Sequence, residues 1–175
     1  MTESEWLNCD RLTTLVAFLI GKVSERKGRL LASAGCRLSL PLEGYEHGST
    51  SIEALERYAE GRNKKADCPS LLILDRSESS FHGKDIPLLR DIFGNPFRPI
   101  SINPIWLTPT VTTLATASYE ERIMPSGELD PARLAVLSDA LEEAGCDSPD
   151  ILAHLRSPGP HVRGCWPVDL LLGKE

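Results

Sequence analysis

Four polar side chains in the second half of the chain each stand directly before a proline: Asn103-Pro104, Thr108-Pro109, Asp130-Pro131 and Ser148-Pro149. Side chains of these four types accept hydrogen bonds from the unpaired amides of a first helical turn. Proline is favoured at the first helical position, because the amide proton that it lacks has no partner there and its ring fixes a helical φ. The pairs therefore predict closely spaced helix starts, which keep each helix short.

The first half of the chain carries helix starts of a second kind. Thr2 with Glu5 and Thr50 with Glu53 have the spacing of a capping box, in which a hydroxyl and a carboxylate satisfy backbone amides reciprocally. The leucines of residues 12–19 recur at the spacing of one helix face. We therefore expect helices from the N-terminus onward.

These signals predict a mostly α fold, a compact bundle of short helices joined by Pro/Gly-rich turns. Hydrophobic residues make up 41% of the chain, which suffices for a core. Because short helices are marginal on their own, tertiary packing must hold them. The run Leu71-Leu72-Ile73-Leu74 fits one short strand or hairpin near 71–75 as well as one helical turn, because periodicity cannot separate the two over so few residues.

The length of 175 residues suits one domain. We expect a single helical domain over residues 1–175. An alternative subdivision separates N-terminal helices (1–62), a variable loop or insertion (63–84) and a C-terminal helical part (85–175). The sequence leaves the structure and role of residues 63–84 open.

Charge and hydropathy exclude several classes of protein. The net charge of −6 argues against direct nucleic-acid binding, which depends on neutralising phosphates. No apolar run approaches the roughly 20 residues that span a bilayer, so we expect no membrane contact. The N-terminus is acidic where a signal peptide would be basic, which predicts a cytoplasmic protein with free thiols.

Two longer strings carry a resemblance. Residues 90–99 read RDIFGNPFRP and residues 161–166 read HVRGCW. Together with the first forty residues, they resemble an uncharacterised bacterial family of small paralogous proteins, and the likeness covers most of 88–175. Residues 137–156 are also weakly similar to the helical repeat-companion motif that accompanies leucine-rich-repeat proteins. The resemblance implies a bacterial, cytoplasmic, helical protein and supplies no reaction, ligand or catalytic residue.

The C-terminal part contains a candidate metal set, Cys146, His154, His161 and Cys165. Thiolates and imidazoles are zinc ligands. No paired-cysteine spacing accompanies them, so packing of the two cysteines as small buried hydrophobes is the favoured interpretation. We expect no cofactor, and zinc is the alternative that this set leaves open.

The same residues suggest a nucleophilic pair. Cys165 follows His161 by four positions, so a helix would place both on one face, where an imidazole could lower the pKa of the thiol. Catalytic pairs usually come from distant segments, and the sequence identifies no such partner.

The turn within RDIFGNPFRP offers a candidate interaction site formed by Phe93, Phe97 and Arg98. Aromatic residues and arginine are frequent interface anchors. The favoured alternative is structural: the phenylalanines fasten a stiff loop to the core, and Arg90 or Arg98 pairs with Asp91.

No phosphate-binding, zinc-protease or nucleophile-elbow motif is present in the sequence. The leading hypothesis is a non-enzymatic protein-interaction module, an adaptor or accessory subunit whose partner is another protein. One alternative is an immunity or antitoxin-type protein of a bacterial conflict system, whose acidic surface covers a basic toxin site. The other is a metal- or thiol-dependent enzyme that uses the C-terminal Cys/His set.

Overall fold

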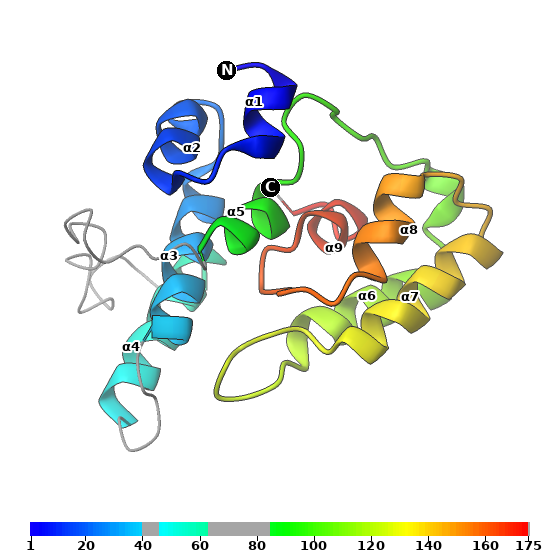
Figure 1. The fold of residues 1–175 in the computed structure, drawn as a ribbon. Helices are drawn as coiled ribbons and strands as arrows, with labels where there is room; N and C mark the ends of the chain where they lie inside the picture. The colour runs from blue at the N-terminus through cyan, green and yellow to red at the C-terminus, as the bar shows by residue number, and fades with distance from the viewer. Residues whose placement is uncertain (40–45, 63–84, 175) are drawn as a thin grey trace.

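The computed structural model describes residues 1–39, 46–62 and 85–174, and within them it is a mostly α fold, as the helix signals predict (Figure 1). Nine α-helices and one 3-10 turn follow one another in these residues: α1 (Glu3–Asn8), α2 (Leu12–Leu19), α3 (Glu25–Ser39), α4 (Glu46–Ala59), α5 (Asp85–Phe93), η4 (Pro104–Trp106), α6 (Pro109–Glu120), α7 (Pro131–Glu143), α8 (Pro149–Leu155) and α9 (Trp166–Leu171). The strand considered near 71–75 lies outside the described residues.

The proline-preceded caps begin helices where the sequence places them. Thr108 accepts a hydrogen bond from the amide of Val111 at the start of α6, and Asp130 accepts one from Ala132 at the start of α7. Asn103 caps only the 3-10 turn η4. Ser148 precedes α8 without a side-chain cap bond. The proline at the first position is thus the more constant part of the signal.

The two predicted capping boxes have different outcomes. Thr2 and Glu5 form the reciprocal pair at the start of α1, with the Thr2 amide 2.7 Å from the Glu5 carboxylate. The prediction at Thr50 was wrong, because α4 begins earlier, at Glu46, and Thr50 lies inside the helix.

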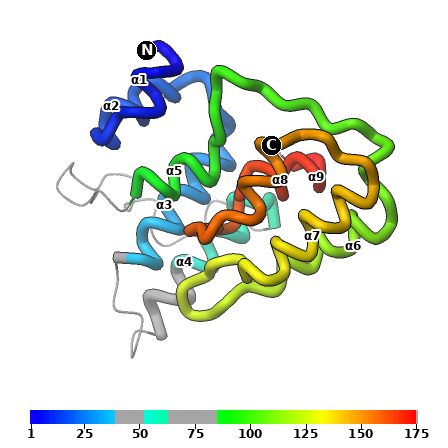
Figure 2. Tube along the Cα trace, turned by 45° about the vertical axis from the view of Figure 1, so that its right-hand side comes forward, coloured from blue at the N-terminus to red at the C-terminus, as the bar shows by residue number. Residues whose placement is uncertain are grey.

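The described helices pack around three apolar clusters, and α5, which lies beside α3 (Figure 2), contributes to two of them. The C-terminal cluster joins α6, α7, α8 and α9, and the N-terminal cluster joins α1 and α2 to Ile86 and Leu89 of α5. The third cluster joins α3 to Leu88 and Ile92 of α5 and to Val162. Helix α5 is therefore covered on several sides, and a polar group on it has little access to water.

One buried polar cluster, the Arg26 network, ties α3 to the C-terminus of the chain. It consists of Arg26, Glu60, Tyr119, Asp169 and Lys174. The Arg26 guanidinium pairs with Asp169 at 2.7 Å and with Glu60 at 2.9 Å. These residues come from α3, α6, α9 and the ends of α4 and α9, so the network joins helices that are far apart in sequence.

Strands play no part in the described ranges, where only the isolated bridges Ile123–Glu128 and Glu128–Val162 are found. In the same residues, each helix is too short or too polar to cross a bilayer.

Candidate metal centre

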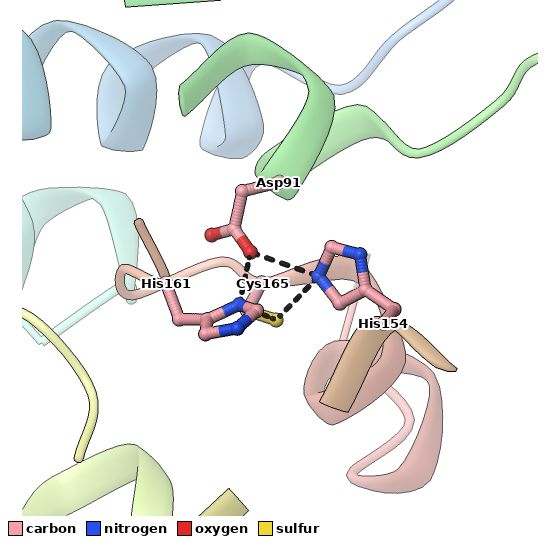
Figure 3. A group of neighbouring side chains, drawn as sticks. All are labelled: Asp91, His154, His161 and Cys165. Atoms are coloured by element: carbon pink, nitrogen blue, oxygen red, sulfur yellow. Dashed lines mark hydrogen bonds and ion pairs between the residues drawn. The ribbon is translucent and has the colours of Figure 1, made fainter. Parts of the chain in front are cut away.

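Four side chains converge in the interior: Asp91 of α5, His154 of α8, and His161 and Cys165 of the segment that leads into α9 (Figure 3). We call them the Asp91 centre. One oxygen of Asp91 lies 2.9 Å from His154 Nε2 and 2.9 Å from His161 Nδ1. The Cys165 sulfur lies 3.4 Å from the former nitrogen and 3.9 Å from the latter. All four candidate ligand atoms lie within 4.8 Å of one another.

The two strings RDIFGNPFRP and HVRGCW pack against each other and thereby build the centre. Asp91 of the first string contacts His161 of the second, and Gly94 packs against the ring of Trp166. Gly94 has φ +63°, and a Cβ there would lie 3.1 Å from that ring. The glycine in the first string is therefore required both by the left-handed backbone and by the close approach of the indole.

Asp91 is buried and fully bonded. Its second oxygen accepts the amide of Val162 at 2.8 Å. Burial alone would raise the pKa of this carboxyl, but the hydrogen bonds from His154 and His161 outweigh it and hold the pKa below the usual range. Asp91 is thus an anion that two imidazoles and one amide stabilise.

His161 is positioned through both ring nitrogens. Its Nε2 lies 3.0 Å from the carbonyl oxygen of Ser157, which can only accept, so this nitrogen carries a proton. Burial opposes a charge on the ring, but the bond to Asp91 outweighs it and raises the pKa of His161. Its Nδ1 therefore either donates a proton to Asp91 or, with that proton gone, presents a lone pair to a cation.

His154 is oriented by Trp166. The indole Nε1, which can only donate, lies 3.2 Å from His154 Nδ1. The neutral ring therefore carries its proton on Nε2 and donates it to Asp91. In this tautomer His154 is a hydrogen-bond donor within the centre, and it can ligate a metal only after its proton moves to Nδ1.

The thiol of Cys165 is fully buried. Burial raises its pKa well above the ordinary value, and the neighbouring charge of Asp91 raises it further. A reactive cysteine needs a lowered pKa and access to a substrate. The thiol of Cys165 has neither, so this geometry disfavours a nucleophilic role. A bound cation would reverse the effect, because it deprotonates a coordinating thiol.

The arrangement is that of a ligand set rather than a proton relay. In a relay, the acid and the nucleophile contact opposite nitrogens of one imidazole. Here Asp91 and Cys165 approach the same nitrogen of each ring. Zinc bonds of 2.0–2.3 Å in a tetrahedron place ligands about 3.3–3.8 Å apart. The two sulfur–nitrogen separations, 3.4 and 3.9 Å, are close to this range, whereas the two oxygen–nitrogen separations of 2.9 Å are those of hydrogen bonds and would have to widen around an ion. Nitrogen and sulfur donors suit zinc and not calcium or magnesium.

The structure brings together three of the four predicted ligands and corrects the fourth. His154, His161 and Cys165 belong to the centre, whereas Cys146, which like Cys165 is buried in the C-terminal apolar cluster, does not. Burial raises the pKa of the Cys146 thiol. Asp91 takes the expected place of Cys146.

The turn after α5 is fastened to the N-terminal helices. Phe93 packs against two apolar clusters, and the ring of Phe97 stacks on Phe18 at 5.4 Å between centroids. Arg98 is exposed and pairs with Glu3. The expected pairing of Arg90 or Arg98 with Asp91 was wrong, because the histidines occupy that carboxylate. Arg90 instead donates to three backbone carbonyls, those of residues 6, 7 and 9.

A cleft of about 850 Å³ lies beside the centre, between α1, α2, the turn after α5, and the helices α8 and α9. Phe93 and Arg98 line it, but Phe97 does not. Of the Asp91 centre, only His154 reaches the wall of the cleft, where Trp166 lies next to it. We call this the Trp166 cleft.

Comparison of the chain with protein-family models, with curated proteins and with solved structures found no match. The function is therefore argued from the geometry of these residues.

Proposed function

We propose that this chain is a non-enzymatic module that binds another protein, and that a zinc ion at the Asp91 centre fastens its helices. The ligands would be Asp91, His154, His161 and Cys165. They come from α5, from α8 and from the segment between α8 and α9, and a long stretch of chain separates α5 from the other two. Ion binding there would hold together the region where the three apolar clusters meet.

The burial of the centre carries the proposal. The side chains of Asp91 and His161 are 2% and 1% exposed, and that of Cys165 is completely buried. A catalytic zinc keeps one position open for water or substrate, whereas a structural zinc is closed by four protein ligands. The Asp91 centre supplies four ligands, three of them almost completely buried, and only His154, whose side chain is 20% exposed, reaches the wall of the Trp166 cleft.

Charge supports the same interpretation. A zinc ion with one carboxylate and one thiolate is formally neutral, and the histidines add no charge. Burying a neutral assembly avoids the large desolvation cost of a net charge. The Ser157 carbonyl that accepts from His161 Nε2 is the outer-sphere partner that zinc-bound histidines commonly have.

Elemental analysis of the purified chain tests the metal part of the proposal. Zinc is added, unbound metal is removed, and zinc per chain is measured for the wild type, Cys165→Ser, Asp91→Asn and Cys146→Ser. We expect near-stoichiometric zinc in the wild type and in Cys146→Ser, and a large loss in the other two variants. Cys146→Ser is the matched control, since it alters a buried thiol outside the centre.

Thermal unfolding supplies the second readout. A ligand that binds only the folded state at 100 times its dissociation constant stabilises by about 2.7 kcal/mol. We expect zinc to raise the Tm of the wild type and of Cys146→Ser, and chelation to reverse the rise. Far-UV circular dichroism checks that each variant folds. The proposed zinc site would be contradicted if the folded wild type held no zinc after zinc is added, or if Cys165→Ser and Cys146→Ser lost zinc equally.

A further inference from the structure

The Trp166 cleft is cationic although the chain is acidic. Lys22, Lys27, Arg90 and Arg98 line it, against two carboxylates, those of Glu3 and Asp150. The chain as a whole carries a net charge of −6. A local excess of positive charge in an acidic protein attracts anionic groups and repels cationic ones.

Two of the cations lack a carboxylate partner among the described residues. Arg90 is satisfied only by backbone carbonyls, and its Nε is buried without a hydrogen-bond partner. The ammonium group of Lys22 lies 3.4 Å from the centroid of the Phe18 ring. Their charges are therefore not neutralised by a carboxylate of the described residues, and they contribute to the positive potential of the cleft.

Apolar rings line the cleft between these charges. Phe18, Phe93 and Trp166 all contribute to its surface. The volume of about 850 Å³ lies within the range of binding sites, about 300–1,000 Å³, and has room for a few side chains. An occupant should therefore combine carboxylates with apolar side chains.

We infer that the Trp166 cleft binds an acidic segment of a partner protein, with its carboxylates toward Lys22 and Arg90 and an apolar side chain against Phe93 and Trp166. The inference rests on the proposed role as a protein-binding module and names the chemistry of its partner. The immunity hypothesis requires the opposite partner, a basic surface that is covered by acidic residues.

Peptide binding to the zinc-loaded full chain tests the inference. The probes are three fluorescein-labelled peptides of equal length that alternate Phe or Leu with Glu, with Lys or with Ser. Fluorescence anisotropy gives their Kd at low and at physiological salt. We expect the Glu peptide to bind at least about 10-fold more tightly than the others, and to weaken as salt screens the charges.

Charge reversal locates the site. Lys22→Glu places a negative charge at the cleft, and Arg133→Glu makes the same change of net charge at an exposed residue outside it. We expect Lys22→Glu to weaken the Glu peptide at least about 10-fold, and Arg133→Glu to change its Kd less than about 2-fold. Both residues are exposed, so both variants should fold.

The outcomes separate the two proposals. Preferred binding of the Lys or the Ser peptide overturns the acidic partner and leaves a protein-binding role standing. If Lys22→Glu and Arg133→Glu change the Kd of the Glu peptide equally, the peptide does not bind in the Trp166 cleft. If no peptide binds while the zinc content is as expected, the cleft inference fails and the metal centre stands.

Discussion

The Arg26 network and the Asp91 centre are both buried and polar, and both join distant helices, yet their contacts are distributed differently. In the network, Arg26 donates through all three of its nitrogens to two carboxylates, those of Glu60 and Asp169, and Lys174 donates to the other oxygen of Glu60. In the centre, one oxygen of Asp91 receives both imidazoles. The Arg26 network is thus a set of pairs between cationic and anionic side chains, whereas in the Asp91 centre two imidazoles meet at one carboxylate oxygen.

This difference separates two uses of buried polar groups. The network is complete with protein atoms alone, because each cationic nitrogen faces an anionic oxygen or a hydroxyl. The centre brings oxygen, nitrogen and sulfur ligand atoms within 4.8 Å of one another, so that a single cation could contact all of them. The network should therefore respond to charge removal and ignore zinc, whereas the centre should respond to both.

The largest effect is expected from Arg26→Met, which removes the cation from the network. Among the described residues, Asp169 then loses its only ion-pair partner and Glu60 loses one of its two. Breaking a buried ion pair from one side costs about 3–5 kcal/mol. Urea unfolding should show this loss at pH 7, while zinc per chain stays as in the wild type. Arg156→Met, which breaks exposed pairs, should have a much smaller effect, because exposed ion pairs contribute little to stability. Altered zinc content in Arg26→Met would show that the two clusters are not independent.

A smaller effect should distinguish the two carboxylates of the network. Burial would raise the pKa of Glu60, but bonds from Lys174 and Tyr119 and the charge of Arg26 lower it to about 2. Burial dominates at Asp169 and raises its pKa, although Arg26 opposes it. We therefore expect Glu60→Gln to cost roughly 2 kcal/mol more than Asp169→Asn at pH 7, since hydrogen bonds to charged groups are worth about 1.5–3 kcal/mol.

The pH dependence of the unfolding free energy tests whether Glu60 stabilises the fold through its charge. The folded pKa of Glu60 lies below its unfolded value of 4.5, so its contribution is present above pH 4.5 and is lost as the pH falls toward 2. The difference in unfolding free energy between the wild type and Glu60→Gln should therefore shrink over this window. A difference that stays constant down to pH 2 would show that Glu60 does not act through its charge.

The smallest effect that we expect is an increase in zinc affinity, caused by Trp166→Phe. Trp166→Phe keeps a ring and removes the indole N–H that holds His154 in the tautomer unsuited to metal. Changes to outer-sphere partners alter metal affinity by about 10–100-fold. We expect zinc to bind roughly 10-fold more tightly, as measured by competition with a chromophoric chelator. Weaker binding would mean that the indole supports the metal-bound state.

Local signals predicted the helices because their causes are local. A cap and its proline are adjacent to the amides that they affect, so Thr108 and Asp130 could be placed from sequence alone. Thr50 failed because a four-residue pattern does not show whether a helix has already begun. The mostly α class followed from the sum of such signals.

The centre could be predicted only in part, because its contacts are long-range. Asp91 is 63 and 70 positions from its two histidines, and no spacing pattern connects them. Cys146 and Cys165 look equivalent in sequence and are both buried in the C-terminal apolar cluster, and only packing decides that the sulfur of Cys165 also lies beside the two histidines. Asp91 lies within the string RDIFGNPFRP, which the sequence analysis did single out. There the phenylalanines and arginines indicated an interaction site or a stiff loop, and Asp91 was not predicted as a ligand.

The hydrogen bond between Trp166 and His154 links two sites that would otherwise be independent. Trp166 lies on the wall of the cleft, and His154 lies on the boundary between the cleft and the centre. An occupant that draws the indole away frees the proton of His154 to change nitrogen, which favours zinc. Because such coupling is reciprocal, zinc strengthens the binding of that occupant by the same factor. If zinc and a partner bind as proposed, this one indole N–H would couple the two binding events.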